Sequence, residues 1–314
     1  MTSTALVFEG VHPDATVRAA VVSRRRRPFG RWFGETGWRH LVALLALAFA
    51  VFPVLWVVSA AFSDGTLNRQ TLIPEEPTLD NFRTLMSDPN HPPFWSWFRN
   101  SMTVGVVTSV AQVFMCACAA YAFSRLRFRG RRPGMLALLL IQMFPNLLAM
   151  VAIYLFMLRI KDVFPSFGVG TYWGVVLIYL GASLGVNTWL MKGFFDTIPR
   201  ELDEAARVDG ASHPQIFFRV IIPLAAPVLA VIALLSFIAT QSEYLVASVV
   251  IGAGADQQQT LAVGLATFVS GNQFESRWGP FDAGALIGAI PVVVLFLFLQ
   301  RFVVSGLTSG AVKG

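Results

Sequence analysis

A short polar run, Gln241-Ser242-Glu243-Tyr244, interrupts an apolar stretch of the chain. A carboxylate costs at least about 2.5 kcal/mol to insert at the centre of a bilayer, so Glu243 should face the interior of a helix bundle. Amide, hydroxyl and carboxylate groups beside an aromatic ring can bind sugar hydroxyls and stack on a sugar face. The run is therefore a candidate for contacts along a translocation path. The alternative is a structural polar contact with a partner subunit, or an extracellular cap.

Asn146, Asn187 and Thr188 are further polar side chains within apolar segments. Asn187 is a second candidate for the path, although hydrogen bonding between neighbouring helices is the commoner role of such residues. Cys116 and Cys118 lie inside one apolar segment and are the only cysteines, so neither a disulfide framework nor a zinc site is expected. We expect both cysteines to pack between helices, and we expect no catalytic residue and no metal site.

Six apolar segments must position these residues. The chain is 55% hydrophobic with a mean hydropathy of +0.62, which is more apolar surface than one soluble core could bury. Each segment is long enough for a helix to cross about 30 Å of hydrocarbon, and the apolar runs are continuous, unlike the alternating strands of a β-barrel. The predicted fold is an all-α integral membrane protein with six transmembrane helices, at residues 41–62, 102–123, 135–158, 171–191, 220–250 and 283–300.

Prolines and paired glycines within these segments predict local geometry. We expect the prolines to kink their helices and the G-x-x-x-G pairs to allow close helix contacts. The prolines are Pro53, Pro145 and Pro291, and the pairs are Gly181 with Gly185 and Gly284 with Gly288.

The distribution of basic residues predicts the orientation in the membrane. With six spans, 18 of the 24 Lys and Arg residues fall on the side that holds both termini, and cytoplasmic loops carry such an excess. Both termini of this multi-pass protein are therefore expected in the cytoplasm. The run Arg24 to Arg27 is expected to lie on anionic lipid headgroups, and the net charge of +6 does not indicate nucleic acid because the basic residues flank the spans.

This orientation divides the chain into three parts. Residues 1–40 form a basic cytoplasmic segment, residues 41–304 form the membrane domain, and residues 305–314 form a cytoplasmic tail. The cytoplasmic loop of interest is 195–220, and the external loops include 63–98 and 251–282. The long polar stretch before the first span does not suit a cleaved secretory signal, so we expect the N-terminal segment to be retained.

The cytoplasmic loop predicts a helix, a glycine turn and a second helix. Pro199 suits a first helical turn, and Gly210 supplies a left-handed stop. Ser212 and Gln215 have the spacing of a capping box that starts the next helix.

One face of the first of these helices is small and flat. Leu202, Ala205 and Ala206 recur at i, i+3 and i+4, and alanine side chains allow a partner surface to approach closely. Pattern alone leaves two interpretations open: a docking surface for another protein, or an amphipathic helix on the membrane surface.

The sequence of this loop resembles the EAA motif of bacterial ABC importer permeases, in the run Glu204-Ala205-Ala206-Arg207-Val208-Asp209-Gly210-Ala211 followed by Ile222-Pro223-Leu224. In that family the loop is the coupling helix, which docks in a cleft of the ATPase subunit. The resemblance implies an ATPase-coupling role for the following residues: Glu204, Ala205, Ala206, Asp209, Gly210 and Ala211.

The resemblance extends over most of the chain from about residue 40 and is strongest to maltose-type, MalG-like permease subunits. It is carried by 52–56, 142–145, 260–264 and the terminal run 306–314. It implies the MetI/MalG-like permease fold in a bacterial inner or plasma membrane. The implied partners are a MalF-like second permease subunit, a MalK-like ATPase dimer, an extracytoplasmic solute-binding protein and a sugar. By the same resemblance, the outer loop with Gln273 and Trp278 is expected to contact the binding protein, and the tail is expected to contact the ATPase subunits.

No G-x-x-x-x-G-K-[ST] phosphate loop occurs in the sequence, so ATP and Mg are expected on partner subunits and this chain is not expected to be an enzyme or to bind a cofactor. The resemblance favours maltose or maltodextrin import. Trehalose, another α-glucoside or a different solute is the alternative cargo. An ion-coupled secondary transporter, in which Glu243 would titrate, is the competing class.

Overall fold

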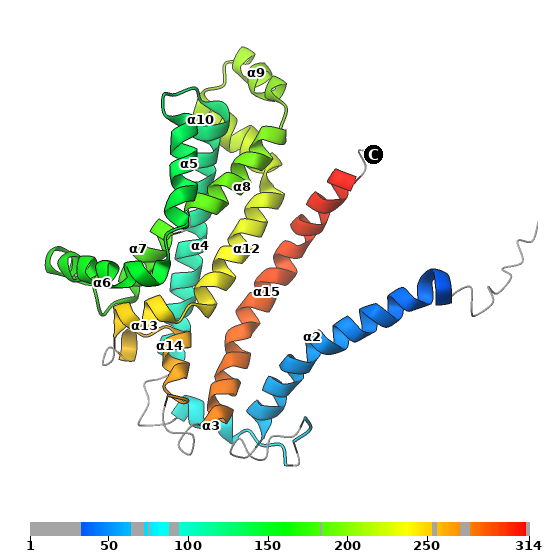
Figure 1. Cartoon of the computed structure of the whole chain (residues 1–314), viewed down its shortest axis with the longest axis vertical. Coiled ribbons are helices and arrows are strands. Elements are labelled where there is room, and N and C mark those ends of the chain that lie inside the picture. Colours follow the sequence, from blue (N-terminus) through cyan, green and yellow to red (C-terminus); the bar gives the residue numbers. More distant parts are fainter. Residues whose placement is uncertain are drawn as a thin grey trace, which may run out of the picture. The chain divides into compact units, whose positions relative to one another are not determined.

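The computed structural model describes residues 33–63, 72–74, 76–87, 94–182, 184–252, 256–270 and 277–311. These residues form helices joined by short turns, and the only β-type pairing described is an isolated bridge between Ser63 and Pro77 (Figure 1). The predicted all-α class is therefore confirmed. The run Arg24 to Arg27 lies outside the described residues. The chain divides into two units, Met1–Pro53 and Val54–Gly314, and each is described by itself.

The first unit contains η1 (Phe33–Gly37) and the first part of α2 (Trp38–Phe62). The α2 residues from Leu41 to Phe52 are exposed although almost all are apolar. A helix that is apolar all round and uncovered by its own chain is typical of a membrane span. The prediction for 41–62 is confirmed as one helix, which continues through Pro53.

Three helices of the described chain are each long and apolar enough to cross a membrane: α2, α4 (Phe94–Arg125) and the part of α15 (Trp278–Ala311) up to Phe302. Two bent pairs of helices raise the number to five if each pair is one span. The predicted count of six is therefore not reached by these criteria. α15 also continues through Pro291 and extends to Ala311, inside the predicted tail.

The predicted span 135–158 is wrong as a continuous helix. It is divided into α5 (Arg131–Gln142) and α6 (Asn146–Val163) by a turn that ends at Pro145. Proline has no N–H to donate, and its ring disfavours the helical conformation of the residue before it. α6 also carries Arg159, Lys161 and Asp162 in its last turns, which lowers its apolar character.

The other two long segments are also interrupted. The prediction at 171–191 corresponds to α7 (Tyr172–Ala182) and α8 (Leu184–Thr197), and the prediction at 220–250 ends as a helix at Ser242. The helical segment 213–224 and the following helix α12 (Ala226–Ser242) are bent by 78° relative to each other. The short elements of this region are α9 (Arg200–Val208), α10 (His213–Ile216), η4 (Phe217–Ile221), α11 (Ile222–Leu224) and α13 (Leu245–Ile251).

Within the second unit, α4 is the central helix and packs against α7, α8 and α12 (Figure 1). Gly105 of α4 allows α12 to approach closely, because a Cβ there would lie 2.6 Å from Gln241 Nε2 and 2.8 Å from the Phe237 ring. Cys116 is fully buried in a core shared by α4, α8 and the 216–232 region, as predicted. Cys118 is exposed, so its predicted packing role is wrong: two residues along a helix point to different sides.

The predicted glycine contacts are partly confirmed. Gly284 and Gly288 of α15 lie against α14 (Leu261–Ala266), where added Cβ atoms would meet Leu265 at 2.3 Å and Leu261 at 2.5 Å. Gly185 lies against Gln142 of α5, whereas Gly181 has nothing within 4 Å. The remaining elements are α3 (Asp80–Ser87), η3 (Pro165–Phe167) and η5 (Asp256–Gln258).

Candidate functional site

The segment 199–224 has the predicted arrangement of helix, glycine turn and helix. α9 begins directly after Pro199, and Gly210 has φ +83°, the left-handed conformation expected of a glycine stop. The turn is closed by hydrogen bonds from Gly210 N to Arg207 O (2.9 Å) and from Ala211 N to Ala206 O (2.9 Å). Ser212 then caps α10, with its backbone N–H donating to Gln215 Oε1 at 2.7 Å, so the capping box is confirmed.

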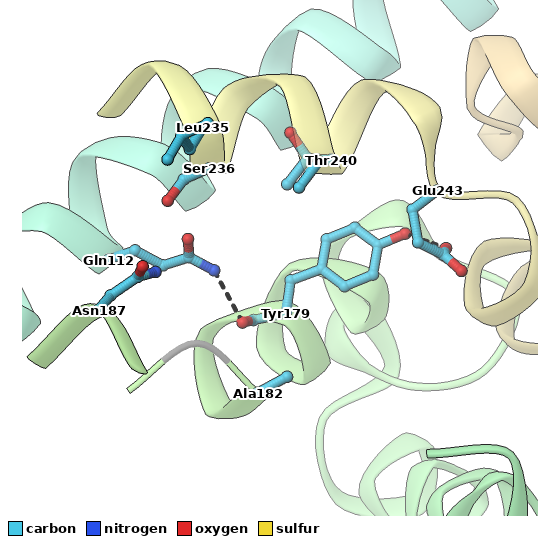
Figure 2. A pocket seen from close by; sticks show the side chains of 9 residues that line it. Gln112, Tyr179, Ala182, Asn187, Leu235, Ser236, Thr240 and Glu243 are labelled. Carbon is cyan, nitrogen blue, oxygen red and sulfur yellow. Dashed lines mark hydrogen bonds between the residues drawn. The ribbon is translucent and has the colours of Figure 1, made fainter. Parts of the chain in front are cut away.

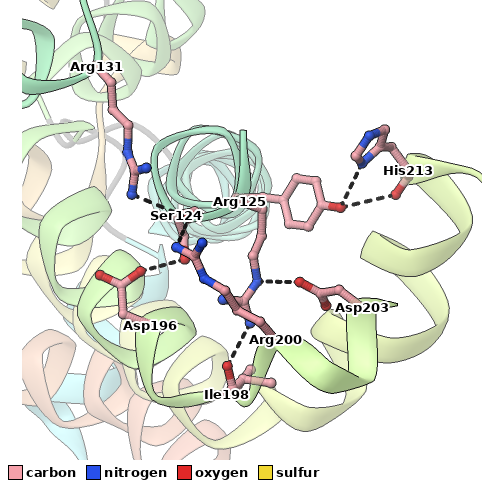
Figure 3. Close-up of polar contacts among 9 residues, drawn as sticks. Ser124, Arg125, Arg131, Asp196, Ile198, Arg200, Asp203 and His213 are labelled. Atoms are coloured by element: carbon pink, nitrogen blue, oxygen red, sulfur yellow. Dashed lines mark hydrogen bonds and ion pairs between the residues drawn. The ribbon is translucent and has the colours of Figure 1, made fainter. Parts of the chain in front are cut away.

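A buried ion pair ties this segment to the end of α4. Arg125 Nε lies 2.7 Å from Asp203 Oδ2 on α9, and their side chains are only 2% and 4% exposed (Figure 3). Arg125 Nη2 also donates to Ile198 O at 2.9 Å. Breaking such a pair by removing one partner leaves a buried charge and typically costs about 3–5 kcal/mol. Arg125 of α4 therefore fixes both Ile198, which precedes α9, and Asp203, in the middle of α9.

Weaker polar contacts surround this pair. Ser124 Oγ donates to Asp196 Oδ1 at 2.6 Å, and Arg200 Nη2 reaches Ser124 O at 3.4 Å (Figure 3). Lys192 forms a further ion pair with Asp196, one turn along α8. Together these contacts connect the last turn of α4 with the end of α8 and the start of α9.

The structure divides the six predicted coupling residues into two groups. Glu204, Ala205, Asp209 and Gly210 are exposed, whereas Ala206 and Ala211 pack against the buried core of this chain. Ala206 therefore does not belong to the exposed face on which the sequence pattern placed it. The reason is the buried Asp203 beside it, which turns that side of α9 toward α4.

An exposed apolar stripe remains on α9. It consists of Leu202, Ala205 and Val208, where Val208 is 88% exposed and Leu202 43% exposed. Sequence reasoning missed Val208, although its i+3 spacing from Ala205 was a usable signal. Exposed apolar side chains in a contiguous group mark surfaces that contact another protein or a membrane.

The second candidate site is a polar pocket of about 340 Å³ between α4, α7, α8 and α12 (Figure 2). It contains Glu243 and Asn187, two of the predicted path residues. Sequence reasoning missed its other polar groups, although Gln112 and Ser236 are polar side chains within long apolar helices and Thr240 directly precedes the predicted polar run. The pocket is lined by Gln112, Tyr179, Ala182, Asn187, Leu235, Ser236, Ala239, Thr240 and Glu243.

Glu243 lies between α12 and α13 with extended backbone, φ −77° and ψ 122°. Its carboxylate accepts hydrogen bonds from Val246 N (2.8 Å) and Ala247 N (3.1 Å), and from the Tyr179 hydroxyl. The negative charge thus lies at the N-terminus of α13, where free N–H groups favour it. The partners that a carboxylate needs in this environment are supplied within the chain, by one hydroxyl and two backbone N–H groups.

The other three residues of the predicted polar cluster are not in this pocket. Gln241, Ser242 and Tyr244 line a separate cavity of about 470 Å³ beside α14 and α15. Gln241 Nε2 donates to Ser101 O at 3.1 Å, and Ser242 Oγ donates to Ile238 O on its own helix. The predicted single cluster is therefore wrong, because successive residues at a helix end point in different directions.

The opposite end of α4 holds the segment that begins at Asp256. Trp97 Nε1 donates to Asp256 O at 3.0 Å, and Asn100 Nδ2 donates to Gln257 O (2.8 Å) and Gln259 O (2.9 Å). Of the predicted binding-protein contacts in this loop, Gln273 lies outside the described residues. Trp278 is half-buried at the start of α15 with its ring 5.8 Å from that of Phe281.

Comparison with known proteins settles the class of this chain. Residues 114–307 match the family model described as "Binding-protein-dependent transport system inner membrane component". The chain belongs to this family. The match contains the whole 199–224 segment. It also contains eight of the nine residues that line the polar pocket; the ninth, Gln112, lies just before it. The chain is therefore a membrane component of a bacterial transport system, and the resemblance to importer permeases is confirmed.

Curated permeases cover nearly the whole length of the chain. It is 38% identical to the maltodextrin transport system permease protein MdxG of Bacillus subtilis, over 88% of this chain and 95% of that protein. It is 37% identical to the maltose/maltodextrin permease protein MalG of Vibrio vulnificus (88% and 96%) and 36% identical to the galactooligosaccharides permease protein GanQ of Bacillus subtilis (88% and 96%). The maltose-type resemblance is thus confirmed at the level of sequence.

A solved structure shares the fold. The crystal structure of a bacterial ABC transporter involved in the import of the acidic polysaccharide alginate matches with a TM-score of 0.68 and 26% identity, over 88% of this chain and 99% of that one. The permease fold predicted for this family member is therefore confirmed.

Proposed function

We propose that this permease is one of the transmembrane subunits of an ATP-driven importer of maltodextrin-like saccharides. A MalF-like second permease subunit would complete the path, a MalK-like ATPase dimer would bind ATP and Mg, and an extracytoplasmic binding protein would deliver the sugar. The names of the similar permeases support this cargo, and the description of the family as binding-protein-dependent supports the binding protein. The observation that carries the proposal is the exposed apolar stripe of α9, held rigidly to α4 by the buried Arg125–Asp203 pair.

The coupling role follows from how α9 is held. A load applied to the exposed stripe Leu202, Ala205 and Val208 reaches Asp203 on the same short helix, and then Arg125 at the end of α4. Gln112, on the wall of the polar pocket, lies on the same helix about 20 Å away at 1.5 Å per residue. Closure of an ATPase pair would therefore move a helix that lines the pocket.

The alternative, that α9 only lies on the membrane surface, has less support. Interfacial helices carry Lys and Arg on their polar face and large apolar side chains on the other. On α9 and its end, exposed acidic residues (Glu201, Glu204 and Asp209) outnumber exposed basic ones (Arg200 and Arg207), and the apolar stripe contains one alanine and no aromatic residue. This surface lacks the basic polar face and the large apolar side chains of an interfacial helix, whereas a protein cleft can accept it.

The proposed function also implies which side of the membrane each segment faces. The 199–224 segment faces the cytoplasm with the basic 1–40 segment and the 305–314 tail, which would contact the ATPase subunits. The 251–282 loop, with Gln273 and Trp278, faces the binding protein. Trehalose or another α-glucoside is the alternative cargo, and GanQ adds galactooligosaccharides to that range. An ion-coupled transporter would leave the stripe of α9 without a partner.

Co-purification of the nucleotide-binding subunit tests the proposal. The double variant Ala205→Asp/Val208→Asp places two charges in the stripe and should abolish co-purification, and Gly210→Pro should do the same by disrupting the turn. Asp162→Ala, at an exposed residue of α6, is the matched control and should leave it unchanged. Retention of the ATPase subunit by the double variant, or uptake driven by a proton gradient without that subunit, would refute the proposal.

A further inference from the structure

The polar pocket lies beside a bend between two helices and the end of a third. α7 and α8 are bent by 49° relative to each other on one wall, and α12 gives way to α13 at Glu243 on the other. Interrupted helices within membrane proteins are tolerated where the backbone is buried in protein or lines a cavity, and solute sites of transporters often lie there. Its volume, about 340 Å³, lies within the range of small-molecule sites, roughly 300–1,000 Å³.

At one end of the pocket, the Ser236 hydroxyl, the Asn187 amide and the carbonyl oxygen of Gln112 lack hydrogen-bond partners within the described chain. The Ser236 side chain is 5% exposed, and its hydroxyl has no hydrogen-bond partner among the described residues. Asn187 makes no side-chain hydrogen bond to any described residue, and Gln112 uses only its Nε2, which donates to Tyr179 O at 2.9 Å. Figure 2 shows the Ser236 hydroxyl directed toward the Gln112 and Asn187 side chains.

An unpartnered hydroxyl buried in this way costs free energy unless something binds it, typically about 1–3 kcal/mol. A hydroxyl, an amide and an amide carbonyl offer both donors and acceptors, which match the hydroxyl groups of a sugar. The Tyr179 ring, Leu235 and Ala239 supply the apolar wall that the C–H face of a sugar ring would contact.

The charge of the pocket selects among saccharides. Among the described residues that line it there is no Lys, Arg or His, and the one charged residue is Glu243, whose carboxylate accepts hydrogen bonds from Val246 N, Ala247 N and Tyr179. A uronate in this pocket would lose its hydration without a cationic partner and would face the Glu243 carboxylate. A neutral saccharide has neither penalty.

We propose that this pocket is a subsite for a neutral, hydroxyl-rich unit of the transported saccharide, with Ser236, Asn187 and Gln112 as its hydrogen-bonding groups. This inference rests on the importer function proposed above and restricts its substrate class. It separates this permease from the structural relative whose transporter imports the acidic polysaccharide alginate.

The test measures direct binding of trisaccharides to the assembled complex. The binding protein is left out because it has its own saccharide specificity. Saturation-transfer NMR on the complex in nanodiscs would use maltotriose, galactotriose and a mannuronate trisaccharide as probes. The neutral trisaccharides should bind and the mannuronate trisaccharide should not. Ser236→Ala and Asn187→Ala should each weaken maltotriose binding about 3–10-fold, the value of one hydrogen bond.

Ser242→Ala is the matched control, because that hydroxyl bonds its own helix and lines the other cavity. Equal maltotriose binding by wild type, Ser236→Ala and Asn187→Ala, absence of neutral-sugar binding, or equal binding of the mannuronate probe would each overturn the subsite. ATPase activity stimulated by the binding protein should persist in both variants, since α9 is untouched. Loss of that stimulation in the wild-type complex would instead contradict the proposed function.

Discussion

Arg125 at the end of α4 and Asp203 in the middle of α9 form an ion pair of 2.7 Å in which both side chains are almost completely buried. The pair joins α4, the central helix of the second unit, to the helix that carries the exposed apolar stripe Leu202, Ala205 and Val208. Its burial makes it costly to break and therefore suited to carry force between the two elements.

Asp203→Ala should lower the free energy of unfolding by about 3–5 kcal/mol, because it leaves the Arg125 guanidinium buried without a counter-charge. A thermal-shift assay on the purified complex would show a clear drop in Tm, and ATPase activity should lose its dependence on the binding protein. The exposed pair Arg83–Asp80, with side chains 76% and 63% exposed, provides the control. Asp80→Ala should change stability by less than about 1 kcal/mol, and a similar effect of both variants would contradict the argument from burial.

Gly210→Ala should destabilise the 199–224 segment by about 1–2 kcal/mol, because φ +83° is costly for any residue with a Cβ. No atom lies within 4 Å of the position that the Cβ would occupy, so the cost is conformational and not steric. Gly193→Ala, a helical glycine with equally open surroundings, should instead be neutral or slightly stabilising. Hydrogen exchange across residues 200–216 would measure the difference, and equal protection in both variants would count against a required left-handed turn.

Asn100→Leu should release the 256–261 segment from α4. The substitution removes both hydrogen bonds of Asn100 Nδ2 and leaves the carbonyls of Gln257 and Gln259 without that donor, at a cost of about 1–3 kcal/mol. Faster hydrogen exchange at residues 256–264 is expected, with weaker stimulation of ATPase activity by the binding protein. Thr103→Ala, which removes only a bond to Arg99 O on the same helix, should have neither effect. Unchanged exchange in Asn100→Leu would show that the hydrogen bonds from Trp97 Nε1 to Asp256 O and from Leu261 N to Ser101 Oγ suffice to hold the segment.

Glu243→Gln should weaken the start of α13 even if no sugar touches it. The carboxylate accepts from three donors, and an amide would turn its NH₂ group toward at least one of them. The expected result is reduced uptake together with a lower Tm. Adding Tyr179→Phe should not restore the lost stability, because the Tyr179 hydroxyl can also accept from an amide NH₂ group, whereas the N–H groups of Val246 and Ala247 can only donate. Normal stability with abolished uptake would instead place Glu243 in direct contact with the cargo.

The orientation of the chain can be measured with single cysteines in a background without Cys116 and Cys118. Arg129→Cys lies in the exposed turn between α4 and α5 and should react only with a membrane-permeant maleimide in intact cells. Asp162→Cys, on α6, should also react with an impermeant one. The reverse pattern would place the 199–224 segment outside the cell and exclude the coupling role.

The amino-acid sequence determined the features that depend on neighbours only a few residues apart. Gly210 had to end a helix, Ser212 and Gln215 had to start the next one, and the apolar runs had to be helices for a bilayer, because these preferences act within one or two turns. The helix breaks at Pro145 and at Glu243 also depend on nearby residues, but the apolar residues on either side led to predictions of continuous helices there.

Tertiary structure alone decided which distant residues meet. Asp203 pairs with Arg125 across 78 positions, and Glu243 meets Tyr179 across 64, and no local pattern marks either partner. The same packing turned Ala206 inward, separated Glu243 from Gln241, and brought Gln112 and Ser236 to Asn187. Hydrogen bonds and ion pairs act over a few ångströms, so their partners are known only when the helices are placed side by side.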